Sequence, residues 1–174
     1  HPKKHSNTYL LYKKGWSGIN IDMEQDKINL FNIARPQDFN YFGAISDISK
    51  KATVYRNQKY GVSSSIKSDH INKKDIIDQS SIQTTTLNNV LANSPFEGKK
   101  IDLLNIDTEG SDFEVLQSLD FKIYDPTIII IETHANNIDE ILKSNIYTFL
   151  INKDYKLKSW CLHSLIFNKK ESRK

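Results

Sequence analysis

The amino-acid sequence predicts an α/β fold, in which a mainly parallel sheet is flanked by helices, and three observations support this. Apolar runs alternate along the chain with helix-like stretches, which is typical of βαβ units. Residues 127–131 (TIIII) are continuously apolar and β-branched, as expected for a parallel strand that is buried on both faces. The chain has 174 residues, of which 38% are hydrophobic, so it fits a single domain, 1–174, with its own core.

The first third of the chain is predicted to form a helix, a strand and a second helix. Residues 8–14 (TYLLYKK) form the first helix, which ends at Gly15. Residues 18–22 (GINID) form a short apolar strand. Residues 24–34 have the spacing of an amphipathic helix, and Pro36 ends it.

Individual side chains of these two helices have expected roles. Ser6 or Asn7 is the candidate N-cap of the first helix, because a side-chain oxygen at that position accepts a backbone N–H. In the second helix, Ile28, Leu30 and Phe31 are expected to face the core.

The middle of the chain alternates between ordered elements and a long polar stretch. Residues 41–46 (YFGAIS) and 52–56 (ATVYR) are predicted strands, and 86–92 (TLNNVLA) is a predicted helix. Residues 57–81 are rich in Ser, Lys, Asn and Asp and contain few apolar side chains. This composition predicts a mobile surface loop, which we expect to lie on the acceptor side of an active site.

The last part of the chain is predicted to complete the sheet. Residues 101–106 (IDLLNI) are a strand, 112–119 (DFEVLQSL) are a helix, and 138–152 are the longest helix candidate. An antiparallel pair of strands, 155–161 with 164–168, precedes a polar tail that is expected to fray.

Composition excludes several classes of protein. Lys and Arg total 24 against 21 Asp and Glu, and few of the cations are Arg, so no nucleic-acid binding is predicted. The single Cys161 excludes a disulfide framework and a thiolate zinc site, because both need several cysteines. No apolar run approaches the roughly 20 residues of a transmembrane helix, and no signal-peptide pattern opens the chain. We therefore expect a cytoplasmic protein, whose oligomeric state the sequence does not predict.

Four predicted strands end in carboxylates. Asp22 follows GINI, Asp47 follows GAIS, Asp107 follows IDLLNI and Glu132 follows TIIII. Ligands of open α/β sheets bind outside the carboxyl ends of the strands, so these four side chains are expected to form one acidic rim at a binding site. The alternative for each residue taken singly is a helix N-cap or a solvated turn.

Asp22 has a more specific interpretation. An acid after the second strand of such a sheet accepts hydrogen bonds from the two ribose hydroxyls of a nucleotide cofactor. That cofactor is either NAD or S-adenosylmethionine. No G-x-G-x-x-G motif is present, but this is weak evidence against NAD because the first strand and its turn would precede His1.

These residues resemble the FkbM family of S-adenosylmethionine-dependent methyltransferases over nearly the whole chain. The matching pieces are HPKKHSNTYLLYKKGWSGINID, GAISD, TLNNVL, IDLLNIDTEGSDFEVLQSLDF, PTIIIIETH and KDYKLKSW. The most diagnostic piece is Asp-x-Glu-Gly, which is Asp107-Thr108-Glu109-Gly110 here. The resemblance implies a Rossmann-like class I methyltransferase fold with a seven-stranded sheet. It also implies an O-methyltransferase that acts on a hydroxyl of a sugar, glycolipid or natural-product acceptor.

The chain departs from this family at two places. Family members carry an acidic, glycine-containing turn before the position of His1, and their Glu-Pro is Asp22-Met23 here. We therefore expect a domain that is truncated at its N-terminus and lacks the first strand. The sheet should have no central strand between the strands that end at Asp22 and Asp107. The isolated chain should be less stable than the full protein and should bind S-adenosylmethionine poorly.

The reaction that the resemblance implies needs a base to take the proton of the acceptor hydroxyl. The candidate catalytic residues at the strand ends are His134, Asp107, Glu109 and Glu132. His134 is preferred because histidine titrates near neutral pH, and Glu132 either orients it or caps a turn. The alternative for His134 is a loop histidine bonded to the backbone, and Asp107 and Glu109 instead contact the methionine end of the cofactor or hold the loop. His163 is assigned to the final hairpin.

The candidate cofactor-binding residues are Asp22, Asn7, Thr8, Asp47 and Asp107. Asp22 is the ribose ligand, and Asn7 and Thr8 belong to the opening segment that follows the turn beneath the cofactor. The other predicted partner is a small-molecule or glycan hydroxyl acceptor.

Three alternatives stay open at this point. Asp107, Glu132 and His134 could together hold Mg²⁺ or a transition metal, although no dedicated spacing motif is present and we predict no metal. The chain could be a non-catalytic methyltransferase-like domain that has lost its cofactor site. It could also be an NAD-dependent oxidoreductase on a similar sheet.

Overall fold

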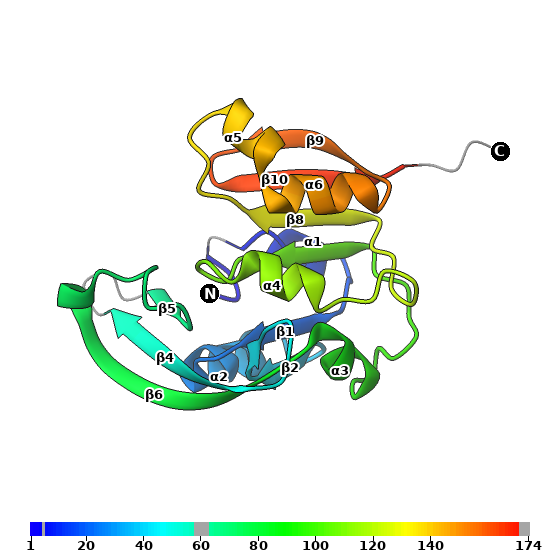
Figure 1. Ribbon diagram of the computed structural model, residues 1–174. Coiled ribbons are helices and arrows are strands. Elements are labelled where there is room, and N and C mark those ends of the chain that lie inside the picture. Colours follow the sequence, from blue (N-terminus) through cyan, green and yellow to red (C-terminus); the bar gives the residue numbers. More distant parts are fainter. Residues whose placement is uncertain (5, 58–62, 171–174) are drawn as a thin grey trace.

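The computed structural model describes residues 1–4, 6–57 and 63–170 and has a mixed α/β architecture with three sheets (Figure 1). The helices are α1 Tyr9–Lys13, α2 Gln25–Ala34, α3 Leu87–Ala92, α4 Asp112–Gln117, α5 Ile138–Lys143 and α6 Asn145–Asn152, with a short 3-10 helix, η1 Lys73–Asp75. The strands are β1 Ile19–Asp22, β2 Phe39–Phe42, β3 Ala44–Ile45, β4 Lys51–Asn57, β5 Ser63–Ser65, β6 Ile76–Thr85, β7 Leu103–Ile106, β8 Ile128–Glu132, β9 Tyr155–Cys161 and β10 Ser164–Lys169.

The hydrophobic core lies on a four-stranded sheet of order β7-β8-β10-β9. β7 and β8 are parallel, and β10 is antiparallel to both β8 and β9, as predicted for the C-terminal pair. Ile129 and Ile131 of β8 and Leu165 and Phe167 of β10 are fully buried. Helices α4 and α6 lie in front of this sheet in Figure 1 and pack against each other. The apolar run of β8 is therefore a central strand, as its composition predicts.

A second, two-stranded sheet pairs β1 with β2 in parallel, next to α2. The predicted strand 41–46 is wrong in its bounds, because the chain pairs with β1 only as far as Phe42. After Gly43 it continues as β3, which pairs with β6 instead. In α2, Ile28 is buried as predicted, but Leu30 is 44% exposed and does not face the core. The inward face of α2 is thus narrower than its apolar composition suggests.

No strand of the described residues lies between β1 and β7. β1 pairs with β2 and β7 pairs with β8, and neither sheet is bonded to the other. A cavity of about 800 Å³ separates them, and residues 18–22 and 101–107 line it without interruption. The predicted gap between the strands ending at Asp22 and Asp107 is therefore present in the part of the chain that the structure describes. A continuous seven-stranded sheet is not seen.

The third sheet has the order β3-β6-β4-β5, and its strands β4, β5 and β6 form a curved β-arm (Figure 1). It corrects the prediction that residues 57–81 form a loop without regular structure, although 58–62 lie outside the described residues. β6 is ten residues long and pairs antiparallel with β4, which also pairs antiparallel with β5. Most of β6 is exposed, so it has neither a buried face nor the apolar alternation that marks a strand in a sequence.

The predicted helix 138–152 is two helices. Ser144 lies between α5 and α6 with extended backbone, and its Oγ accepts a hydrogen bond from the N–H of Tyr147. A serine that caps a new helix in this way interrupts the old one. The end of the predicted polar tail, 171–174, lies outside the described residues.

The opening segment of the chain is anchored by a buried guanidinium. Arg35 follows α2, is 1% exposed, and donates from Nε to the carbonyl oxygen of Pro2 at 2.9 Å. It also donates to the hydroxyls of Thr8 and Ser6, each at 2.7 Å. Thr8, rather than Ser6 or Asn7, occupies the N-cap position of α1, without a capping side-chain bond. Arg35 thus fixes the start of the described chain against α2.

None of the helices in the described part of the chain has both the length and the apolar composition needed to cross a bilayer.

Candidate active site

The large cavity between β1 and β7 has two of the predicted cofactor-binding carboxylates at one end. Asp22 and Asp107 both line it. The positive charge of Lys27 acts on both carboxylates, so the carboxyl ends of the two strands lie near the same side chain. Lys27 Nζ lies 3.7 Å from Asp22 Oδ2. Of the four carboxylates that were expected to form one acidic rim, Asp22 and Asp107 therefore line the same cavity.

Burial governs the charge of both carboxylates. It raises the pKa of Asp22 above its ordinary value, and Lys27 opposes this rise. It also raises the pKa of Asp107, and the neighbouring charge of Asp112 adds to the effect. Asp22 Oδ1 accepts a hydrogen bond from the N–H of Glu24 at 2.9 Å, so the side chain is held at the start of the turn after β1. A fixed, partly desolvated carboxylate of this kind binds hydroxyl donors well.

Two predicted cofactor residues in the opening segment also line the large cavity. They are Asn7 and Thr8. Asn7 Nδ2 donates to Asn105 Oδ1 on β7 at 2.8 Å, and the hydroxyl of Thr8 accepts from Arg35. The segment therefore lies against β7 on the side that faces the cavity.

Asp47 is the predicted cofactor residue that the structure does not bring to this cavity. It is exposed, and it lies after Ser46 rather than among the residues that line the cavity. The hydroxyl of Ser46 donates to Asp47 Oδ1 at 2.9 Å and lowers the pKa of Asp47. The break at Gly43 explains its position, because β3 turns away from β1 to join the arm.

The turn from Asp107 to Asp112 is held by hydrogen bonds to Asp112 and lies between two cavities. Asp112 is 6% exposed and accepts from the N–H of Thr108 at 2.8 Å and from that of Gly110 at 3.2 Å. Glu109 and Gly110 have φ values of 52° and 98°, in the left-handed region that favours glycine. Asp107, Thr108 and Glu109 line the large cavity, whereas Gly110 and Asp112 line a smaller one of about 300 Å³.

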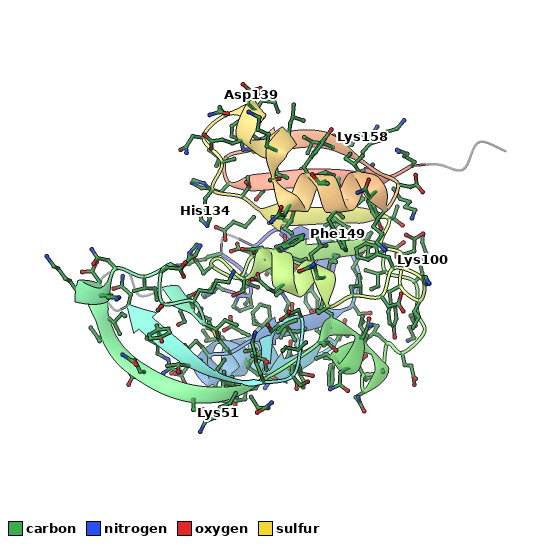
Figure 2. The ribbon with its side chains drawn as sticks, in the orientation of Figure 1. Lys51, Lys100, His134, Asp139, Phe149 and Lys158 are labelled. Carbon is green, nitrogen blue, oxygen red and sulfur yellow. The ribbon has the colours of Figure 1, made fainter. Side chains whose placement is uncertain are left out.

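The predicted catalytic pair Glu132 and His134 lines the smaller cavity. His134 Nε2 lies 3.7 Å from Glu132 Oε2, and the imidazole is about half exposed. Burial raises the pKa of Glu132 to about 8, and the charges of Asp107, Asp112 and Glu109 contribute to the rise. Figure 2 shows His134 beyond the end of β8, on the side where the arm lies. The carboxyl is therefore largely protonated at neutral pH, beside an accessible histidine.

This pKa predicts how stability depends on pH. Between about 4.5 and 8 the carboxyl of Glu132 ionises in the unfolded chain but stays protonated in the fold, so wild-type stability falls as pH rises. We expect Glu132→Gln to lack this loss, and its advantage should grow by roughly 1–3 kcal/mol between pH 5 and 8. Urea denaturation across that range measures it, with the exposed Glu97→Gln as the matched control. If the difference in the free energy of unfolding between Glu132→Gln and the wild type did not change with pH, the raised pKa of Glu132 would be contradicted.

Sequence reasoning missed His70, which the arm brings to the same place. Its ring centroid lies 5.0 Å from that of His134. It also packs against Gly110, since a Cβ added there would lie 1.9 Å from the His70 ring. His163 lies further away, with its ring centroid 6.3 Å from His134, and its carbonyl oxygen accepts from the N–H of Thr133 at 2.7 Å. That bond agrees with the hairpin role predicted for His163.

Ser111 was also missed. It lines the large cavity and is 2% exposed, yet its hydroxyl has no hydrogen-bond partner among the described residues. A buried hydroxyl without a partner is unfavourable, so this oxygen is available to a bound ligand. Nothing in the sequence marks Ser111, because its burial follows from the turn that precedes α4.

The metal alternative has no support from geometry. Asp107, Glu132 and His134 were its proposed ligands. Within residues 1–4, 6–57 and 63–170, no three His, Cys, Asp or Glu side chains are arranged to hold a metal ion.

One comparison with known proteins gave a match. The family model described as the methyltransferase FkbM domain matches residues 2–157. Searches of curated proteins and of solved structures gave no significant match. The matched range includes the lining residues of both cavities apart from His1, and the other site residues described above apart from His163.

Proposed function

The chain belongs to the methyltransferase FkbM domain family, and from this premise we propose that it is an S-adenosylmethionine-dependent O-methyltransferase. The family implies methyltransferase activity. The cofactor and the hydroxyl acceptor, on a sugar, glycolipid or natural-product molecule, are parts of our proposal. So is a Rossmann-like arrangement of the sheet.

The observation that carries this proposal is the lining of the large cavity. Asp22 and Asp107, from separate sheets, both line it, and the positive charge of Lys27 acts on both carboxylates. The cavity volume of about 800 Å³ is within the range of small-molecule and cofactor sites. The residues present fit a cofactor with ribose hydroxyls and a charged amino-acid end. Asp22 can accept from the hydroxyls, and the partnerless hydroxyl of Ser111 is free to pair with a polar group.

The residues of the smaller cavity supply the proton chemistry. S-adenosylmethionine, when bound, supplies an activated methyl group for in-line displacement. His134 takes the proton of the acceptor hydroxyl as the new C–O bond forms, so the products are a methyl ether, S-adenosylhomocysteine and a proton at His134. Glu132 lies 3.7 Å away and orients the ring. Burial raises the pKa of the Glu132 carboxyl to about 8, and a positive charge that develops on His134 favours its ionised form.

Calorimetry with S-adenosylhomocysteine and with NAD tests the cofactor assignment. We expect S-adenosylhomocysteine to bind, weakly in this chain and more tightly in a chain that supplies the central strand, and NAD not to bind. Asp22→Ala should weaken binding by roughly 1–3 kcal/mol, the loss of a charged hydrogen-bonding partner. Asp47→Ala is the matched control, because Asp47 lies outside the cavity and its loss should leave affinity unchanged. Equal affinity of the wild type and Asp22→Ala would remove the ribose assignment, and preferential binding of NAD would favour an oxidoreductase.

A further inference from the structure

The loop after β5 is fixed onto the turn that follows β7. Ser65 is fully buried, and its hydroxyl donates to the carbonyl oxygen of Glu109 at 2.8 Å. The same hydroxyl accepts from the N–H of Lys67 at 3.0 Å. Lys67 Nζ then lies 2.7 Å from Glu114 Oε1 on α4. These contacts join the arm to two elements of the site, so the loop forms a fixed wall of the smaller cavity.

This wall presents His70 to the cavity. Ile71, the next residue, is 4% exposed and holds the backbone, while the His70 side chain is exposed. The ring lies over Gly110, which has no Cβ to displace it. The ring centroids of His70 and His134 lie 5.0 Å apart, so the two imidazoles are neighbours in the lining of the smaller cavity.

The chemistry of the lining indicates what fits there. Glu114 and Glu132 line the cavity, and Oε2 of each is buried without a hydrogen-bond partner among the described residues. An apolar ligand would leave these oxygens unpaired. A hydroxyl group donates to a carboxyl oxygen and accepts from an imidazole N–H, so it matches both kinds of group.

We propose that the smaller cavity binds the acceptor, a neutral ring with neighbouring hydroxyl groups, and that His70 is a positioning residue that orients it toward His134. The identification of the bound molecule as the methyl acceptor rests on the proposed function. The binding site itself is inferred from the contacts described above. In this proposal the arm contributes to the acceptor site as β-structure, not as the mobile loop that the sequence predicts.

Histidine-ring NMR tests the proposal without an activity measurement. The probe is methyl α-glucopyranoside, added at increasing millimolar concentrations, and the ring signals are assigned from single substitutions. We expect the His70 and His134 signals to shift and reach saturation. His70→Ala should weaken the binding seen at His134 about tenfold, as expected for one lost hydrogen bond. His70→Asn, which retains an amide donor, should restore part of the affinity, and the exposed Ser68→Ala is the matched control.

The outcomes separate this inference from the proposed function. Unshifted histidine signals, or equal probe affinity in His70→Ala and the wild type, would overturn the inference even if the protein transfers methyl groups. Saturable shifts that depend on His70, in a protein that transfers no methyl group, would support the site and reject the proposed function.

Discussion

His134→Ala is expected to lower the turnover number about 100-fold or more, because it removes the group that takes the proton of the acceptor hydroxyl. Affinity for S-adenosylhomocysteine should stay nearly unchanged, since His134 lines the smaller cavity and Asp22 the larger. Steady-state kinetics gives the first quantity and calorimetry the second.

His163→Ala is the matched control for this prediction. It removes another imidazole from the same end of the sheet, with a ring centroid 6.3 Å from His134, but His163 does not line the smaller cavity. Its turnover should stay close to that of the wild type. Normal turnover in His134→Ala would return His134 to the role of a loop histidine.

A strand placed between β1 and β7 is expected to raise the free energy of unfolding by several kcal/mol. Each backbone hydrogen bond contributes about 0.5–1.5 kcal/mol, and burial of the apolar lining adds to this. His1 lines the same cavity as Asp22 and Asp107. A segment joined to His1 that runs parallel to both strands can therefore enter the gap.

This prediction is tested by extending the chain before His1 with a short linker and about six Val, Ile and Thr residues, a usual strand length. An extension of equal length made of Gly and Ser is the control. Urea denaturation should show that the chain with the strand-forming extension is more stable than the chain with the Gly and Ser extension. The first chain should also bind S-adenosylhomocysteine more tightly than the second. The Asp22→Ala comparison can then be repeated in the extended chain. Equal stability of the two extended chains would contradict an open strand position.

The elements that the sequence predicted well are those whose local pattern matches their final environment. Residues 127–131 are apolar at every position, and β8 is indeed a central strand with Ile129 and Ile131 fully buried. Thr86 was included at the start of a predicted helix, and its hydroxyl caps α3 by accepting from the N–H of Asn89. Such elements need little information from the rest of the chain.

The elements that were missed depend on contacts between distant residues. β6 has the polar sequence IIDQSSIQTT, and only its long pairing with β4 makes it a strand. Arg56 of β4 lies 2.7 Å from Glu24 after β1, an ion pair that helps to hold the arm in place. No local pattern predicts such a contact. The break at Ser144, by contrast, could have been predicted, since a serine within a long helical stretch is a possible N-cap.

The candidate site likewise contains some residues that a local sequence pattern predicts and others that depend on distant contacts. Asp22, Asp107 and Glu132 were predicted from their positions after apolar strands, and each lines one of the two cavities. Asp47 also follows a predicted apolar strand, but the break at Gly43 places it outside the two cavities. His70 could not be predicted, because it reaches the site only through the contact of the arm with Gly110.

The most direct test of the account is transfer of an isotopically labelled methyl group from S-adenosylmethionine to ring compounds with neighbouring hydroxyl groups, followed by mass spectrometry. We expect the purified protein, and to a greater extent the chain extended with a strand, to form a methyl ether and S-adenosylhomocysteine in equal amounts. Both products should be strongly reduced in Asp22→Ala and His134→Ala and retained in Asp47→Ala. A methyl ether formed at equal rates by the wild type, Asp22→Ala and His134→Ala, or no transfer even by the chain extended with a strand, would contradict it.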